Sequence, residues 1–230
     1  AQIRGARQSV HLLFFRKEAA RARVGARQDS TKCTREQEYA PPADLPEDCL
    51  SLFTDGSAMY DKDMKCWVSA GFGFVAVKGG DGPEHDGGSS IHEHQGPVDL
   101  GDFGGAVRHK TNNISELVAF IHALRYARTA PEARDKSICL RHDSKYAALV
   151  SCGVYKGKKN KALVAIARDE WKLTAASKKA FSKGLWIRHV KGHSNHAWNN
   201  VADKLAGDGN FKRRTHCGPP WTLGPLVGGH

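Results

Sequence analysis

The sequence lacks the features that define several common classes of protein. No apolar run approaches the roughly 18 residues that a membrane-spanning helix needs, so no membrane association is expected. The six cysteines include no Cys-x-x-Cys pair, which argues against a zinc ribbon and against a dense disulfide framework. Several cysteines fall inside apolar patterns, where buried reduced thiols are expected. A reducing, intracellular compartment fits best, and nucleus, cytoplasm and mitochondrion all remain open.

Acidic residues are scarce relative to basic ones. The chain has 35 Lys and Arg against 24 Asp and Glu, a net charge of +11. A basic chain favours an anionic partner, most commonly nucleic acid. The basic excess is greatest in the first 35 residues, which hold nine Lys or Arg and two acids. The next thirteen residues hold five acids, three prolines and no base, a composition typical of a linker.

These shifts divide the chain into three parts. Residues 1–48 are predicted to be a disordered leader and linker, residues 49–208 the folded domain, and residues 209–230 a C-terminal tail without periodicity. The basic composition of the leader suits an organelle transit peptide or a nucleic-acid-binding tail. A leader without any role is equally compatible with the sequence.

The order of the predicted elements within the domain indicates the fold. Strands are expected at 50–54, 70–77, 137–142 and 185–190, with another strand near the polar segment 78–105. Helices are expected after Asn113, from Ser144, over 162–180 and over 199–206. Three strands followed by alternating helices and strands predict an α/β fold with a five-stranded mixed sheet and helices on both faces.

The segment 78–105 contains His85, His92 and His94, which invite a metal-site interpretation. The spacing of these histidines has neither an accompanying cysteine nor helical periodicity. A long, solvated surface loop is the preferred interpretation of this segment.

Three acidic residues occupy positions that suggest a metal-binding catalytic site. Asp55 and Asp143 each follow a predicted strand, and Glu116 lies in the first turns of a predicted helix. Carboxylates that converge repel one another. Mg²⁺ removes that cost because it prefers oxygen ligands. Two such ions suit a phosphodiester displacement.

These acids belong to five motifs that follow one another along the chain. The motifs are Asp55-Gly56-Ser57, Thr111-Asn112-Asn113-Ile114-Ser115-Glu116-Leu117, Asp143-Ser144-Lys145-Tyr146, Lys191-Gly192-His193, and Asn199-Asn200 with Ala202-Asp203-Lys204-Leu205-Ala206. Together they resemble the type 1 ribonuclease H pattern over roughly residues 48–208. The resemblance implies an RNase H-like fold. It also implies an endoribonuclease that hydrolyses the RNA strand of RNA–DNA hybrids, leaving 5′-phosphate and 3′-hydroxyl ends.

The resemblance also implies roles for individual residues. Asp55 and Asp143 are the expected central ligands of two Mg²⁺ ions, for which Mn²⁺ can substitute; Glu116 and Asp203 complete the ligand set. His193 is the expected mobile histidine that assists proton transfer or product release, with a near-neutral intrinsic pKa that suits the role. His196, three residues further on, is its competitor.

Substrate contacts follow from the same resemblance. Recognition of 2′-hydroxyls in the minor groove is expected from the backbone near Gly56 and Ser57 and from Asn112 and Asn113, although both asparagines could serve only as helix caps. The remaining candidates are Thr111 for a phosphate of the DNA strand, Ser144 beside the acidic set, and the basic strip that includes Lys158 and Lys159. A basic run such as this is also typical of a solvated face.

The chain departs from the family pattern in two places. The long Trp- and Lys-rich handle of many members is short here and contains only Trp171, and the 78–105 segment is longer than usual. Three alternatives stay open: a hybrid-binding module that no longer cuts, an integrase- or transposase-like polynucleotidyl transferase, and the ribonuclease H part of a retroelement polyprotein. The family suggests a monomer.

Overall fold

The computed structural model describes residues 36–211, with the exception of 64, 80–86 and 193–195. The described residues belong to a compact unit that begins at Arg35. Residues 1–35 and 212–230, and with them most of the predicted leader and C-terminal tail, lie outside the described residues.

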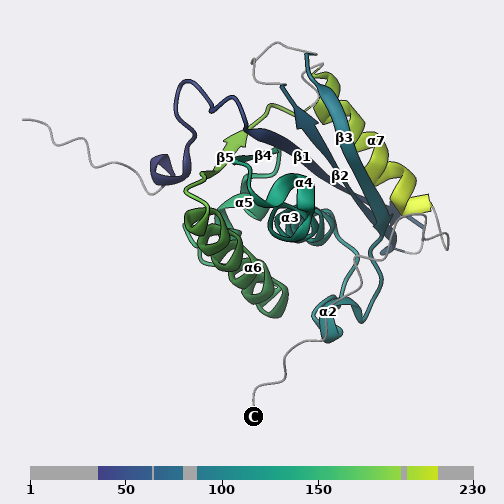
Figure 1. Cartoon of the computed structure of the whole chain (residues 1–230). Helices are drawn as coiled ribbons and strands as arrows, with labels where there is room; N and C mark the ends of the chain where they lie inside the picture. The colour runs from purple at the N-terminus through teal and green to yellow at the C-terminus, as the bar shows by residue number, and fades with distance from the viewer. Residues whose placement is uncertain (1–35, 64, 80–86, 193–195, 212–230) are drawn as a thin grey trace, which may run out of the picture. The chain divides into compact units, whose positions relative to one another are not determined.

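A five-stranded mixed sheet forms the centre of this unit (Figure 1). The strands lie in the order β3-β2-β1-β4-β5. Their bounds are β1 Leu50–Asp61, β2 Cys66–Lys78, β3 Ser89–Pro97, β4 Ile138–His142 and β5 Leu185–His189. The pairs β1–β2 and β2–β3 are antiparallel, and β1–β4 and β4–β5 are parallel. The predicted α/β fold is confirmed.

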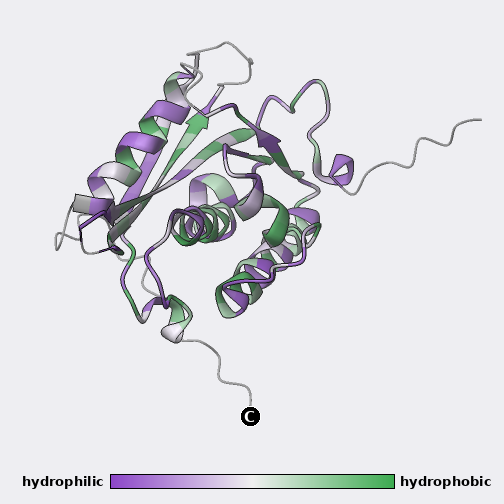
Figure 2. Ribbon diagram, turned by 180° about the vertical axis from the view of Figure 1, so that it is seen from behind, coloured by the Kyte–Doolittle hydropathy of each residue, from purple (hydrophilic) through white to green (hydrophobic). Residues whose placement is uncertain are grey.

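Helices cover both faces of the sheet (Figures 1 and 2). One face carries α7 (Ala197–Phe211), which contacts β1, β2 and β3. The other face carries α3 (Asn112–Thr129), with α5 (Lys145–Ser151) and α6 (Lys161–Ala180) packed against it. Shorter turns of helix are η1 (Gln37–Tyr39), α2 (Asp102–Gly105) and α4 (Pro131–Arg134). No helix among the described residues is long and apolar enough to cross a membrane.

The two faces have cores of very different size. Alternate residues of a strand point to opposite faces, so Leu52 and Phe74 enter the large core beneath α3, whereas Phe53 and Val75 enter the small core beneath α7. The α3 core includes fully buried residues such as Leu124. In Figure 2 the central strands carry hydrophobic stretches, whereas the edge strand β3 is mainly hydrophilic.

Glycines of β2 allow α7 to lie directly on the sheet. A Cβ atom on Gly71 would lie 2.1 Å from the backbone nitrogen of Asn210, and one on Gly73 would lie 2.5 Å from that of Ala206. Both distances are far below any normal Cβ contact. Backbone therefore meets backbone along this seam, with no layer of side chains between the helix and the strand.

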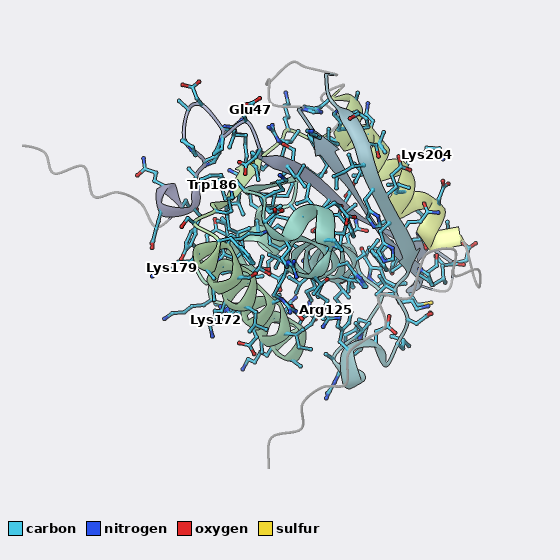
Figure 3. The ribbon with its side chains drawn as sticks, in the orientation of Figure 1. Glu47, Arg125, Lys172, Lys179, Trp186 and Lys204 are labelled. Carbon is cyan, nitrogen blue, oxygen red and sulfur yellow. The ribbon has the colours of Figure 1, made fainter. Side chains whose placement is uncertain are left out.

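A second layer of contacts ties α6 to the α3 side. Glu170 accepts from Arg125 at 2.7 Å and from Arg128 at 3.0 Å, and Figure 3 labels Arg125 on α3. The buried Lys178 of α6 donates to the carbonyl oxygens of Ala133 at 2.6 Å and Arg134 at 3.1 Å.

Part of the predicted linker also contacts the domain. Tyr39 packs edge-on against Trp171 with ring centroids 5.5 Å apart, and the hydroxyl of Tyr155 donates to Glu36. Residues 36–39 therefore lie against the folded unit.

The structure differs from the expected elements at two strands. β1 continues through the Asp55-Gly56-Ser57 sequence to Asp61, so no turn occurs there. The predicted loop over 78–105 contains β3, and His92 and His94 lie on this strand. Both histidines are half-buried against the ring of Phe74, so the solvated-loop interpretation is wrong for them. The residues of β3 are polar because it is an edge strand that is only partly covered. His85 lies outside the described residues.

The cysteines of the described residues are free thiols. Cys49, Cys139 and Cys152 are buried, and Cys66 is exposed. Burial of the first three agrees with the expectation of reduced thiols within apolar elements.

Candidate active site

Four elements bring the four predicted carboxylates to one region. Asp55 is buried in the middle of β1, and Asp143 directly follows β4. The parallel register pairs Thr54 with His142, so Asp55 and Asp143 are the next residues on neighbouring strands. Glu116 comes from the start of α3, and the exposed Asp203 comes from α7.

Electrostatic coupling shows that these carboxylates are close to one another. Burial raises the pKa of Asp55 to about 8, and the negative charges of Asp143, Asp203 and Glu116 add to the rise. Burial and the charge of Asp143 also raise the pKa of Glu116 to about 7. A site with such shifted carboxyl groups favours a bound cation or proton over four free negative charges.

Two hydrogen bonds hold these carboxylates in place. The backbone N–H of Gly56 donates to Oδ1 of Asp55 at 2.7 Å, which partly offsets the rise in the pKa of that carboxyl. The hydroxyl of Ser144 donates to Oε2 of Glu116. The same Ser144 oxygen accepts from the backbone N–H of Ala147 at 3.4 Å and so caps α5.

A glycine makes the approach of β1 to α3 possible. A Cβ atom on Gly56 would lie 2.1 Å from the backbone nitrogen of Glu116. Any larger residue at this position would separate the strand from the start of α3. Gly56 therefore brings Asp55 and Glu116 into the same site, in addition to its predicted role in substrate binding.

The Lys191-Gly192-His193 motif approaches the same site. A Cβ atom on Gly192 would lie 3.2 Å from Oδ2 of Asp143, so this backbone passes directly beside the carboxylate. His193 itself lies outside the described residues. His196, its competitor, is buried against Phe53 with ring centroids 4.9 Å apart, which suits a core histidine.

The predicted substrate residues at the start of α3 lie at the surface of the domain. Thr111 is the N-cap residue, and its carbonyl oxygen accepts from the backbone N–H groups of Ile114 and Ser115. No side chain makes a cap hydrogen bond at Thr111, and the side chains of Asn112 and Asn113 are exposed. The structure places Thr111 at the N-cap position and both asparagines in the first turn of the helix.

The remaining substrate candidates come from β1, from the start of α5 and from the segment that precedes α6. The hydroxyl of Ser57 accepts from the side-chain amide of Asn210 at 3.3 Å. Lys158 and Lys159 are exposed in the segment between α5 and α6. Ser144 is bonded to Glu116, so its position suits orientation of that carboxylate as well as substrate contact.

Sequence reasoning missed three contacts of the site. These are the bond from Ser144 to Glu116, the approach of Gly192 to Asp143, and the bond from Asn210 to Ser57. Each joins residues that are far apart in the chain, and no local pattern signals them. The motif positions of Ser144 and Gly192 were the only available indication.

The donor set fits a hard divalent cation. Within the described ranges, no group of three His, Cys, Asp or Glu side chains is gathered closely enough to form a ready-made ion site. Charge repulsion acts over longer distances than ligation, so this spacing agrees with the raised pKa values. A set made only of carboxylate oxygens suits Mg²⁺ or Mn²⁺ rather than zinc.

Comparison with known proteins identifies the family. The model of the RNase H family matches residues 47–211, and the chain belongs to this family. It is accordingly a ribonuclease H, a hydrolase. A search of curated proteins found no match.

Solved structures with a similar chain trace include cellular and viral proteins. RNase H1 from the halophilic archaeon Halobacterium salinarum NRC-1 is 24% identical, with a TM-score of 0.46, and the match covers 70% of this chain and 96% of that one. LC11-RNase H1 in complex with an RNA/DNA hybrid is 21% identical, with a TM-score of 0.46 and coverages of 69% and 94%. The protease-reverse transcriptase of prototype foamy virus is 22% identical, with a TM-score of 0.49, and the match covers 75% of this chain and 22% of that one.

Proposed function

We propose that this ribonuclease H hydrolyses the RNA strand of RNA–DNA hybrids and leaves 5′-phosphate and 3′-hydroxyl ends. The observation that carries the proposal is the gathering of Asp55, Glu116, Asp143 and Asp203 in one region, where burial and, to a lesser extent, the neighbouring charges raise the pKa of Asp55 to about 8. The exposed start of α3 carries Glu116 into this site, and the exposed Lys158 and Lys159 lie in the segment between α5 and α6.

The acidic set is proposed to hold two Mg²⁺ ions, with Mn²⁺ as a substitute. Asp55 and Asp143 would be the central ligands, and Glu116 and Asp203 would complete the ligand set. When bound, two such ions stabilise the attacking and the leaving oxygen of a phosphodiester displacement.

The chain's own residues supply orientation and proton transfer. Ser144 fixes the Glu116 carboxylate through its hydroxyl, and the Gly56 N–H fixes Asp55. His193 is proposed to donate a proton to the departing 3′ oxygen, which gives the 3′-hydroxyl, and to assist product release, because its intrinsic pKa lies near neutrality. Gly192, which precedes this histidine in the sequence, lies beside Asp143.

Recognition of the hybrid is assigned to the minor groove and the phosphates. Asn112, Asn113 and the backbone at Gly56 and Ser57 would read 2′-hydroxyls, which distinguish the RNA strand. Thr111 would contact a phosphate of the DNA strand. Lys158 and Lys159 would bind the phosphate backbone through charge.

The direct test is cleavage of an end-labelled RNA–DNA hybrid with Mg²⁺, beside duplex DNA, duplex RNA and single-stranded RNA. The wild type should cut only the RNA of the hybrid, and Asp143→Asn and a chelated sample should be inactive. Digestion with end-specific enzymes identifies the product ends. If the hybrid is bound but stays intact with both Mg²⁺ and Mn²⁺, the chain is a binding module instead.

A stability measurement tests the metal site without relying on activity. Asp55→Asn removes a buried charge that its neighbours disfavour, so the metal-free variant should unfold at a higher temperature than the metal-free wild type at about pH 8. Mg²⁺ should stabilise the wild type and have little effect on the variant. Equal stabilisation of both proteins by Mg²⁺ would contradict the assigned ligands.

A further inference from the structure

The last turn of α7 contains a buried side-chain amide, that of Asn210, which is 7% exposed. Its Nδ2 donates to the hydroxyl oxygen of Ser57 at 3.3 Å. Within the described part of the chain, no group donates to its Oδ1, which is closed off from solvent. A buried polar atom without a partner costs stability, and an apolar side chain of the same shape would avoid that cost. The position therefore calls for a functional explanation.

The backbone of β2 fixes Asn210 beside Ser57. Ser57 and Gly71 are partners in the antiparallel register of β1 and β2. A Cβ atom on Gly71 would lie only 2.1 Å from the backbone nitrogen of Asn210, so the end of α7 rests directly on the sheet at this residue (Figure 1). The amide that bonds Ser57 is therefore attached to backbone that cannot shift unless α7 moves.

Ser57 belongs to the same face of β1 as the acidic set. Side chains of a strand alternate between its two faces, so Phe53, Asp55 and Ser57 share one face. Phe53 lies in the core beneath α7, and the charge of Asp203 on α7 contributes to the raised pKa of Asp55. Asn210 follows Asp203 by seven residues, about two helical turns. The same side of α7 thus serves Asp55 with one residue and Ser57 with the next.

The bond from Asn210 determines what the Ser57 hydroxyl can do. Its oxygen accepts from the amide, so its own proton is left for a different acceptor, and none of the described residues accepts it. Ser57 is half-buried, and it lies about 6.6 Å along β1 from Asp55, two residues at about 3.3 Å each. A phosphodiester bound at the acidic set would bring its neighbouring oxygens within reach of this proton.

We propose that Asn210 is a positioning residue, which holds the Ser57 hydroxyl as a hydrogen-bond donor to an oxygen of the RNA strand beside the scissile bond. Two kinds of oxygen share this chemistry: the 2′ oxygen of a ribose and a nonbridging oxygen of a phosphate. The inference rests on the proposed function, and it adds a side-chain contact to the backbone contact assigned to Ser57. Because the contact is made outside the reacting bond, it should act on KM more than on kcat.

The competing explanation is that the bond only fastens the end of α7 to β1. The two explanations differ for Asn210→Leu, because leucine has the same branched shape and no polar atom. If the bond fastens the helix, this variant should unfold at a lower temperature than the wild type. If the amide serves Ser57, the variant should unfold at the same or a higher temperature and still bind the hybrid less tightly.

A double-mutant cycle tests the connection between the two residues. KM and kcat for the end-labelled hybrid are measured with Mg²⁺ for the wild type, Asn210→Leu, Ser57→Ala and the double variant. Each single change should raise KM about threefold to tenfold with little change in kcat, and the double variant should be no worse than Ser57→Ala. Ser57→Thr keeps the hydroxyl and should keep KM near the wild-type value. Asn200→Leu, the same substitution at an exposed position of α7, is the matched control and should leave KM unchanged.

Two series of modified hybrids identify the oxygen, with binding measured without metal so that no strand is cut. One series has a single 2′-deoxyribose on either side of the cleavage site, and the other has a single methylphosphonate in place of a flanking phosphate. The modification that removes the acceptor should abolish the difference in affinity between the wild type and Ser57→Ala. The deoxyribose does so if the acceptor is a 2′ oxygen, and the methylphosphonate does so if it is a phosphate oxygen.

Three results would overturn the inference: an unchanged KM in Asn210→Leu, independent and additive effects of Asn210→Leu and Ser57→Ala, or a difference between the wild type and Ser57→Ala that survives every modified hybrid. Failure of the nuclease assignment would look different, because the wild type would then bind the hybrid in the metal-free titration and leave it uncut with Mg²⁺. The coupling between the two residues could still be measured from that binding.

Discussion

The helices on the two faces of the sheet pack against it through different kinds of contact. On one face, α3 rests on a broad layer of buried side chains, and α6 adds a second layer outside it. On the other face, α7 rests on a small core and on bare backbone at Gly71 and Gly73. The first face supplies most of the buried apolar area, and the second allows almost no adjustment of position.

This difference matters because both faces contribute to the acidic site. Glu116 comes from α3 and Asp203 from α7. A side-chain layer can relax around a change in volume, whereas a backbone contact moves the whole helix. We therefore expect the α3 face to determine mainly stability and the α7 face to determine activity as well.

The largest loss of stability should come from the α3 core. Leu124→Ala removes a fully buried side chain eight residues beyond Glu116 and should lower the free energy of unfolding by about 2–5 kcal/mol. Leu124→Met, which conserves volume, should cost less than about 1.5 kcal/mol. Urea denaturation measures both. The folded fraction of either variant should cut hybrid at the wild-type rate, and a large drop in that rate would contradict the division between the faces.

The α7 seam should respond more strongly in activity than in stability. Gly73→Ala forces a Cβ into the backbone at Ala206 and Ala202, and it should destabilise the domain by about 1–3 kcal/mol. Displacement of Asp203 should reduce kcat of the folded enzyme further. On the same helix, a Cβ at Gly207 meets nothing within 4 Å, so Gly207→Ala should stabilise by about 0.5–1 kcal/mol. If Gly73→Ala and Gly207→Ala changed stability and kcat equally, α7 would be able to shift away from β2 without loss.

The ion pairs between α3 and α6 should contribute less to stability than the apolar core beneath α3. Glu170→Gln leaves Arg125 and Arg128 without a negative partner and should cost about 1–2 kcal/mol, between the values for surface and buried pairs. Lys172→Gln, which removes an exposed pair with Asp169, should change stability by less than about 0.5 kcal/mol. Thermal unfolding at low and high salt separates the two, because salt screens the exposed pair more.

The smallest of the four expected effects is the change in stability with pH that comes from Lys178. Burial lowers the pKa of Lys178 to about 8, so above that pH the unfolded chain binds more protons at this group than the folded one. Its contribution to stability therefore rises with pH, by under about 1 kcal/mol from about pH 7 to about pH 8.5. The stability of wild type minus that of Lys178→Met should follow this rise. A flat difference would mean that the lysine titrates normally.

The sequence was sufficient for the order of strands and helices, because that order depends on local periodicity. Its motifs also singled out four acidic residues that the structure brings to one region. It was misleading where a tertiary contact overrides a local signal. Asp55-Gly56-Ser57 has the composition of a turn, yet β1 continues through it because β2 pairs along its whole length. A third strand was expected near the 78–105 segment, but its residues could not be located because His92 and His94 are polar, although packing against Phe74 and Tyr126 partly buries them.

Within the site, sequence reasoning identified the charged residues but not the atoms that place them. Gly56 was expected to contact substrate, and the structure adds its approach to Glu116. Ser144 was a motif neighbour, and the structure adds its bond to the Glu116 carboxylate. Such contacts depend on the distance between elements, which no spacing along the chain contains.

The position of α7 also bears on when the enzyme becomes active. Asp203 and Asn210 are the last site residues to be synthesised, and a nascent chain that already contains β1, α3 and β4 still lacks the helix they occupy. Docking of α7 along the glycine seam then supplies the fourth carboxylate in one step. A ribosome-bound chain that ends before residue 197 should therefore carry a nearly complete sheet and no nuclease activity, so that the domain is silent beside RNA until α7 has been synthesised.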